Sequence, residues 1–105
     1  MLDICKVYAY TLAVIKTFRS KALEAFFTTG DVRKLPVRNV SRLRRILLAL
    51  ASASKPEDMN LPGFKFHGLD GDRVGTYSVW ITGNWRVTFQ WEGADVLNAD
   101  IEDYH

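Results

Sequence analysis

The sequence predicts an α+β fold in which two N-terminal helices pack on a small, mainly antiparallel β-sheet. Apolar residues recur at helical spacing in the first half of the chain, and they alternate with polar residues in the second half. A chain of 105 residues with 48% hydrophobic content is long enough for one compact domain around a single core. Helices followed by strands are typical of an α+β domain.

The N-terminal half is predicted to contain a short strand and two helices. Residues 15–19 have the pattern of a short strand. Ser20 is a good N-cap for a helix over 21–28, which Gly30 would end. A helix over 38–51 has a stronger signal because its apolar residues recur at helical spacing; these are Val40, Leu43, Ile46, Leu47 and Leu50.

Beyond turn-forming segments at 55–58 and 60–63, strands are expected over 64–69, 77–81, 85–91 and 96–102. A three-residue loop over 82–84 pairs Ile81 with Trp85, whereas a two-residue loop pairs Ile81 with Arg86. The three-residue loop is expected because it places both apolar rows on one face. That face holds Tyr77, Val79, Ile81, Trp85, Val87, Phe89 and Trp91, and the opposite face holds Ser78, Trp80, Arg86, Thr88 and Gln90.

Charge is unevenly distributed, although the formal net charge is only +2. Residues 15–54 carry a net charge of +7 and residues 55–105 a net charge of −5. The basic half could present a cationic surface to nucleic acid, but ordinary solvated helix faces give the same pattern. Arg38, Arg42 and Arg45, spaced i, i+4 and i+7, leave the same two alternatives open: phosphate binding or a solvated face.

Cys5 is the only cysteine, so an intramolecular disulfide is excluded and a reducing compartment is favoured. The apolar stretch over 7–15 is too short to span a bilayer, and no clear signal-peptide cleavage site follows it. We therefore expect a cytoplasmic protein without a membrane partner.

Three C-terminal segments resemble the HigB branch of the RelE superfamily of bacterial toxins. They are His67-Gly-Leu-Asp-Gly-Asp-Arg73-Val-Gly-Thr-Tyr77-Ser-Val, Asn84-Trp85-Arg86-Val-Thr-Phe89 and Glu102-Asp103-Tyr104-His105. The resemblance covers residues 15–105 as a single RelE-like domain. Residues 1–14 are then an N-terminal extension or a mis-annotated start, because Val14-Ile15-Lys16 has the form of the Met-Ile-Lys with which relatives commonly begin.

The resemblance implies a RelE-like fold and a type II toxin that enters the ribosomal A site and cleaves translated mRNA without a metal or other cofactor. The implied partners are the 70S ribosome, mRNA and a HigA-like helix-turn-helix antitoxin, with operator DNA reached only through the antitoxin. By motif match, His67 takes the place of the catalytic histidine and Arg86 that of the strand arginine. Asp103, Tyr104 and His105 match the terminal triplet, and Arg73 matches a basic loop residue that contacts RNA.

Cleavage of RNA through its own 2′-hydroxyl needs a base, an acid and cationic donors for the phosphate. His67 and His105 are the only histidines and are the candidate acid–base pair, since imidazole exchanges a proton near neutral pH. The guanidinium of Arg86 suits phosphate oxygens. Asp103 can orient a histidine or share the base role, and Tyr104 can stack on a base or donate its hydroxyl proton.

Two residues depart from the family pattern. Asp70 stands where relatives often carry lysine, which removes one cation near the RNA. Trp80 occupies a strand position that is often basic in relatives, and on the Arg86 face it could stack on a base.

Two alternatives to a metal-independent ribonuclease remain. One is a ParE-like gyrase poison or antitoxin-binding module without nuclease activity, and the other is a metal nuclease that uses Asp103, His105 and His67.

Overall fold

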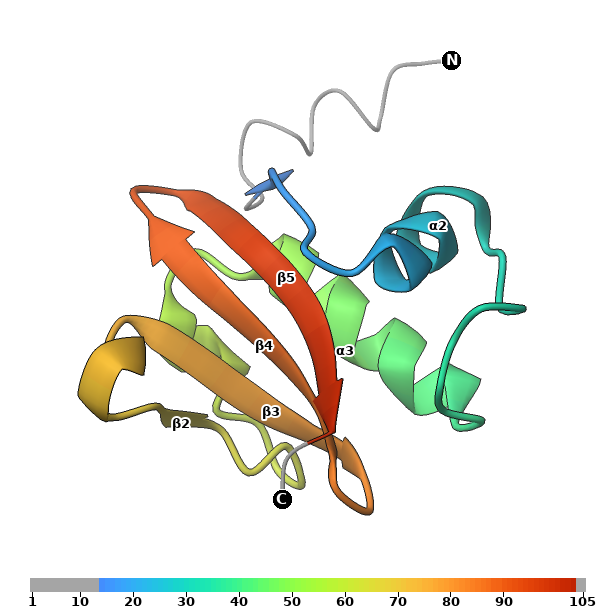
Figure 1. The fold of residues 1–105 in the computed structure, drawn as a ribbon. Helices are drawn as coiled ribbons and strands as arrows, with labels where there is room; N and C mark the ends of the chain where they lie inside the picture. Colours follow the sequence, from blue (N-terminus) through green and yellow to red (C-terminus); the bar gives the residue numbers. More distant parts are fainter. Residues whose placement is uncertain (1–13, 104–105) are drawn as a thin grey trace.

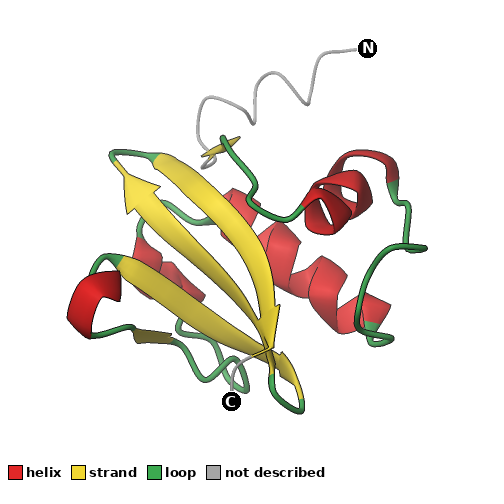
Figure 2. Cartoon of the chain, viewed as in Figure 1, coloured by secondary structure: helices red, strands yellow, loops and turns green. Residues whose placement is uncertain are grey.

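The computed structural model describes residues 14–103 and confirms the α+β fold class. Its five strands lie in the order β1-β5-β4-β3-β2, with β1 parallel to β5 and the other neighbours antiparallel. Helix α3 lies against one face of this sheet and α2 lies beside β5 (Figures 1 and 2). The strands are β1 (Val14–Ile15), β2 (His67–Gly68), β3 (Thr76–Thr82), β4 (Trp85–Glu92) and β5 (Asp95–Asp103), and the helices are α2 (Lys21–Thr29) and α3 (Val40–Ser52).

Two short 3₁₀ helices, η1 (Pro56–Met59) and η2 (Gly71–Arg73), lie in the connections before β2 and β3. Neither α2 nor α3 has the length and hydrophobicity needed to cross a bilayer, and residues 14–103 contain no other α-helix. Apart from Val14, the expected N-terminal segment lies outside the described residues, and so do Tyr104 and His105.

The caps set the limits of both helices. The Ser20 hydroxyl accepts a hydrogen bond from the Leu23 amide at 3.0 Å, and Gly30 ends α2 in the left-handed region, so both predicted caps are confirmed. Helix α3 begins at Val40, later than expected, because the side chain of Asn39 caps it. Arg38 therefore precedes the helix, and the predicted helical stripe from Arg38 through Arg45 was wrong at its first member.

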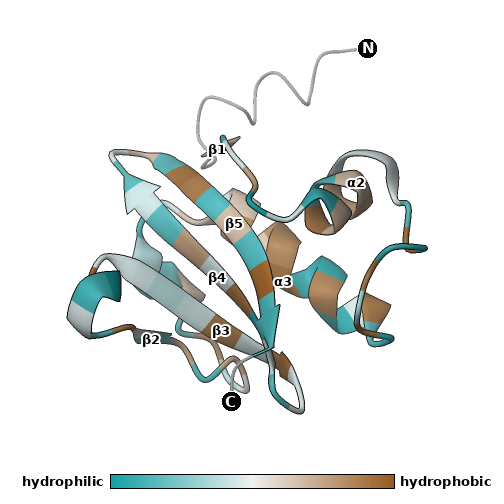
Figure 3. Ribbon diagram, viewed as in Figure 1, coloured by the Kyte–Doolittle hydropathy of each residue, from teal (hydrophilic) through white to brown (hydrophobic). Residues whose placement is uncertain are grey.

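The core forms between α3 and the sheet. Figure 3 shows apolar residues recurring along α3 and alternating with hydrophilic ones along β4 and β5. The expected inward row of the β3–β4 hairpin is confirmed, although Tyr77, Trp85 and Trp91 are only half-buried at its margins. The buried centre includes Leu43, Ile46, Leu47 and Leu50 from α3 and Val79, Ile81, Val87 and Phe89 from the hairpin.

The β3–β4 hairpin has the expected register along its length but a different tip. Val79 pairs with Val87 and Trp80 with Arg86, as the shared apolar face requires. At the tip, however, Thr82 pairs with Trp85, so the predicted three-residue loop was wrong. A bulge at Ile81 supplies the extra residue, which allows a two-residue turn without moving the apolar row to the other face.

The strand predicted over 64–69 was also wrong, since only His67 and Gly68 are extended as a paired strand. The reason is Lys65, whose φ of 50° lies in the left-handed region and interrupts the extended backbone. The strand predicted over 15–19 is likewise reduced to β1 and an isolated bridge between Phe18 and Ala99. This segment runs beside a bulge in β5 at Asn98, and the backbone amide of Asn98 donates to the Thr17 hydroxyl at 2.8 Å.

Candidate functional site

The sheet face opposite α3 carries polar side chains in cross-strand rows, and we call it the polar face. Residues directly opposite each other in neighbouring strands share a face. One row holds His67, Ser78, Thr88 and Asp100, and the next holds Trp80, Arg86 and Glu102. His67 and Arg86 therefore lie in adjacent rows, separated by β3 alone, with backbones about 12 Å apart.

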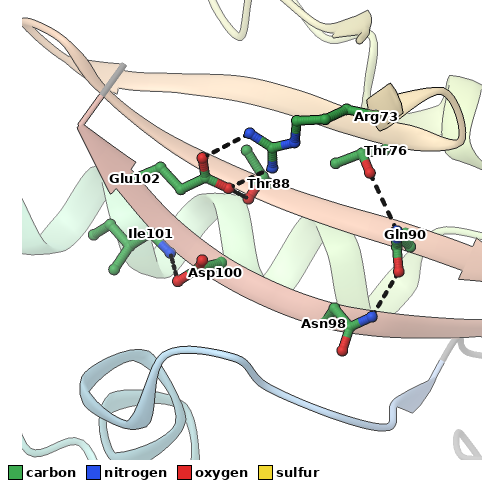
Figure 4. A network of polar contacts seen from close by, with 8 residues as sticks. All are labelled: Arg73, Thr76, Thr88, Gln90, Asn98, Asp100, Ile101 and Glu102. Atoms are coloured by element: carbon green, nitrogen blue, oxygen red, sulfur yellow. Dashed lines mark hydrogen bonds and ion pairs between the residues drawn. The ribbon is translucent and has the colours of Figure 1, made fainter. Parts of the chain in front are cut away.

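An ion pair ties the loop before β3 to the end of β5 on this face (Figure 4). Arg73 donates two hydrogen bonds to the carboxylate of Glu102, at 2.9 and 2.7 Å, and the Thr88 hydroxyl donates to the same carboxylate. Arg73, expected to contact RNA, is thus held by Glu102 in this structure. Beside this pair, Asn98 donates to the side-chain oxygen of Gln90 at 2.6 Å, and the Gln90 amide donates to Thr76 at 3.3 Å.

Two hollows adjoin each other on the polar face, with Asp72 and Arg73 lining both. The first has a volume of about 210 Å³ and lies over the Glu102 network, with Arg19 at its margin. The second has a volume of about 270 Å³ and is lined by the segment from His67 to Asp70. Arg73, which pairs with Glu102 in the first hollow, therefore also borders the space beside His67.

The pKa values of two carboxylates on β5, Glu102 and Asp100, are shifted in opposite directions. The hydrogen bonds from Arg73 lower the pKa of Glu102, and the Thr88 hydroxyl adds to this effect against partial burial. Burial raises the pKa of Asp100, a shift that the Ile101 amide opposes and the nearby Glu102 charge increases. The same strand thus holds one carboxylate that favours ionisation in the folded state and one that resists it.

Glu102→Gln is expected to destabilise the protein by about 1 kcal/mol at pH 7, since it removes a bidentate, charge-assisted pair that solvent partly screens. Because the folded-state pKa of Glu102 is lowered, its contribution is complete above the unfolded pKa and is lost as pH falls through the folded pKa. Urea unfolding of both proteins from pH 7 down to about pH 2 measures this. If the stability difference between the two proteins stayed constant below about pH 4.3, the lowered pKa of Glu102 would be contradicted.

Asp100→Asn is expected to change the free energy of unfolding in the opposite direction, stabilising the protein at pH 7 by a few tenths of a kcal/mol. The amide oxygen of asparagine can still accept from the Ile101 amide, now 2.8 Å from Asp100, while the partly buried charge is removed. Because the folded-state pKa is raised, the gain is present above that pKa and vanishes as pH falls below the unfolded value. The same urea series measures it, and a less stable variant at pH 7 would show that the Asp100 charge is favourable.

His67 is exposed at the edge strand, and its ring Nδ1 lies 3.2 Å from the carbonyl oxygen of Lys65. Arg86 is half-buried, with its Nε and Nη1 atoms shielded from solvent. Asp103 is exposed and pairs with Trp85 at the end of β5. The structure thus brings His67 and Arg86 onto one face and ends β5 next to the Arg86 end of β4, while Tyr104 and His105 follow beyond the described residues.

The other candidate RNA-binding residues differ in burial and in their intramolecular contacts. Arg42 donates to the Trp80 carbonyl at 3.3 and 3.2 Å and to the Gly63 carbonyl, and its guanidinium lies 5.0 Å from the Trp80 ring centroid. It therefore joins α3 to β3. Trp80 is half-buried, with the Lys65 ammonium 4.5 Å from its ring centroid, whereas Arg38 and Arg45 are exposed.

Sequence reasoning missed two residues of this region, Glu102 and Lys65. The expected strand alternation would have placed Glu102 on the Arg86 face, so a signal for it existed. Lysine has no preference for the left-handed region, so no residue pattern marks Lys65. Between residues 14 and 103, no three His, Cys, Asp or Glu side chains form a group that could hold a metal ion. The alternative metal site that includes His105 extends beyond this range.

Comparison with known proteins adds three matches. The family model described as the RelE-like toxin of type II toxin-antitoxin system HigB matches residues 16–105. A protein named Endoribonuclease HigB from Proteus vulgaris is 36% identical over 92 residues, which cover 88% of this chain and 100% of that protein. Toxin HigB-1 from Vibrio cholerae is 29% identical over 89 residues, which cover 83% of this chain and 94% of that protein.

Proposed function

This chain belongs to the HigB-like toxins of type II toxin-antitoxin systems, and from that premise we propose that it is a ribosome-dependent endoribonuclease that cleaves translated mRNA in the A site. The name of the Proteus vulgaris relative supports the endoribonuclease class. The observation that carries the proposal is the sheet register, which aligns His67 and Arg86 in adjacent rows of the polar face. His67 supplies one of the two proton-transfer groups that such a reaction needs, and Arg86 supplies a cationic donor for the phosphate.

In the proposed reaction the 2′-oxygen of the RNA attacks the adjacent phosphorus and its proton passes to a base. The bond from phosphorus to the 5′-oxygen breaks, and an acid protonates that oxygen. The products are a 2′,3′-cyclic phosphate and a 5′-hydroxyl, so no metal-bound water is consumed. His67 and His105 serve as the acid–base pair, Arg86 binds the phosphate oxygens, Asp103 orients a histidine and Tyr104 stacks on a base.

The charges on the polar face support dependence on the ribosome. Its carboxylates would repel the phosphates of free RNA, and Arg73 is already paired with Glu102. The rims of the two hollows and the end of β5 add further acids, so affinity for naked RNA is expected to be low. The ribosome would supply the binding and orientation that this face lacks. The acids concerned are Asp70, Asp72, Asp100, Glu102 and Asp103.

The family also implies a partner that restrains the toxin. We propose that this partner is a HigA-like helix-turn-helix antitoxin and that operator DNA is contacted only through it. The 70S ribosome and mRNA are the remaining proposed partners, which places the activity in the cytoplasm. The candidate RNA contacts are Arg38, Arg42, Arg45, Arg73 and Trp80, of which Arg42 and Arg73 would have to exchange the intramolecular contacts described above.

A cell-free translation reaction tests the proposal. Purified protein and a variant lacking residues 103–105 are added to the same mRNA with and without ribosomes, and new ends are mapped by primer extension. Cuts inside translated codons that are absent from naked RNA and from the variant are the expected result. Intact mRNA with well-folded protein would contradict the proposal and favour a ParE-like gyrase poison or an antitoxin-binding module without nuclease activity.

End-group analysis of the same cuts separates the two nuclease alternatives. Attack by the 2′-hydroxyl leaves a 2′,3′-cyclic phosphate and a 5′-hydroxyl. A metal-activated water attacks instead of the 2′-hydroxyl and leaves no cyclic phosphate. Fragments without the cyclic phosphate, produced at the earliest times sampled, would contradict the metal-independent reaction.

A further inference from the structure

Lys65 has a backbone conformation that its own side chain does not favour. Its φ is 50°, and Asn98 is the other non-glycine residue with a positive φ in the range 14–103. Asparagine tolerates the left-handed region, whereas a lysine is held there only when the surrounding structure determines it. Such strained positions gather at functional sites, which makes the contacts around Lys65 informative.

Both neighbours of Lys65 are fixed. Phe64 is buried, and its carbonyl accepts a hydrogen bond from the Trp80 amide at 2.7 Å. On the other side, Phe66 stacks on Tyr77 with 5.7 Å between ring centroids. The Lys65 ammonium rests 4.5 Å from the centroid of the Trp80 ring. The backbone therefore turns at Lys65 because the residues before and after it are both packed against β3.

This turn directs the Lys65 carbonyl oxygen to the ring of His67, 3.2 Å from Nδ1. A carbonyl oxygen can only accept a hydrogen bond, so the proton must be on Nδ1. In a neutral imidazole the lone pair is then on Nε2. The hydrogen bond made by one ring nitrogen thus decides which nitrogen is free to take a proton.

We propose that the backbone of Lys65 is a positioning group that holds His67 in its Nδ1-protonated tautomer, so that Nε2 is the atom that accepts the 2′-hydroxyl proton. This inference rests on the proposed ribonuclease function and makes it more specific, because it assigns the base role to His67. The acid that protonates the 5′-oxygen is then supplied by the terminal triplet. The Lys65 side chain has no part in the assignment, which depends on φ and on the carbonyl alone.

Nitrogen-15 NMR of the ring nitrogens tests the tautomer directly and without any cleavage assay. The whole protein is labelled on histidine, and a His67→Gln spectrum identifies the His67 signals, since the chain has only two histidines. At a pH where the ring is neutral, a pyrrole-type shift at Nδ1 and a pyridine-type shift at Nε2 are expected. The reverse pattern in the wild-type protein would overturn the proposal, whatever the activity.

Lys65→Gly and Lys65→Val form a matched pair, because both remove the ammonium but only glycine adopts a positive φ freely. The glycine variant is expected to keep the Nδ1-protonated tautomer, and the valine variant to shift toward the Nε2-protonated one. On programmed ribosomes, the valine variant is expected to cleave at least about tenfold more slowly than the glycine variant. Loss of the tautomer in the glycine variant, with circular dichroism still native, would show that the side chain positions His67 and would overturn the backbone role.

If the valine variant does not fold, the wild-type and glycine spectra still decide the question. Absence of cleavage by the wild-type protein, with the expected tautomer present, would contradict the ribonuclease function but not the positioning of His67. Cleavage by a wild-type protein with the opposite tautomer would leave the ribonuclease function standing and remove the proposal. The two failures are therefore distinguishable.

Discussion

Replacing His67 with alanine is expected to lower the rate of mRNA cleavage on programmed ribosomes by about 10²- to 10⁴-fold, the range for loss of a general acid or base. The ring is exposed and lies on a two-residue edge strand, so its removal takes away little packing. The fold is therefore expected to survive. Single-turnover cleavage rates, measured with excess toxin over ribosomes, separate the chemical step from toxin binding.

His67→Gln is the companion variant, because glutamine can form hydrogen bonds but cannot take up a proton near neutral pH. It is expected to be about as inactive as the alanine variant. Partial recovery of the alanine variant by added imidazole would support proton transfer at this position. A cleavage rate within a few-fold of wild type for either variant, with native circular dichroism, would remove His67 from the reaction.

Replacing Arg86 with lysine is expected to lower the cleavage rate by about 10²- to 10³-fold, because lysine offers a point charge in place of a planar fork for two phosphate oxygens. Arg86 lies opposite Trp80 and Glu102 in the polar face, and its buried Nε and Nη1 atoms place the guanidinium in a partly desolvated position. Single-turnover rates on programmed ribosomes provide the measurement.

Arg33→Lys is the matched control for Arg86. Arg33 lies in the connection between α2 and α3, and its side chain is 84% exposed and paired with Asp31. This control is expected to cleave mRNA like the wild type. If Arg86→Lys behaves like the control, phosphate stabilisation does not depend on the geometry of Arg86, and another cation must supply it.

The sequence was sufficient to predict which residues share a sheet face. Alternation in 77–81 and 85–91 leaves one register that buries both apolar rows, and this places Trp80 opposite Arg86 as observed. The bulge at Ile81 could not be predicted in the same way, since it changes the turn while leaving the buried row unchanged. The alternation of apolar and polar residues shows which register buries the apolar row, but it does not show a bulge that leaves that row on the same side of the sheet.

The structure around His67 was less predictable for a different reason. The left-handed turn at Lys65 depends on how Phe64 and Phe66 pack against β3, which is not encoded in any local propensity. The Arg73–Glu102 pair likewise joins residues far apart in the chain. The motif resemblance identifies Arg73 as a basic loop residue, but only the folded structure shows that Arg73 forms an ion pair with Glu102.

The parallel pairing of β1 with β5 has a consequence for synthesis of the protein. Val14 pairs with Asp95 and Ile15 with Val96, so the first described strand finds its partner only near the end of the chain. The central strands β4 and β5 also come last. Contacts between such distant segments form slowly, because a long loop must close before they are made. The nascent chain therefore cannot complete its sheet while β5 is still inside the exit tunnel, and the polar face is assembled only after residues 95–103 have emerged from the ribosome.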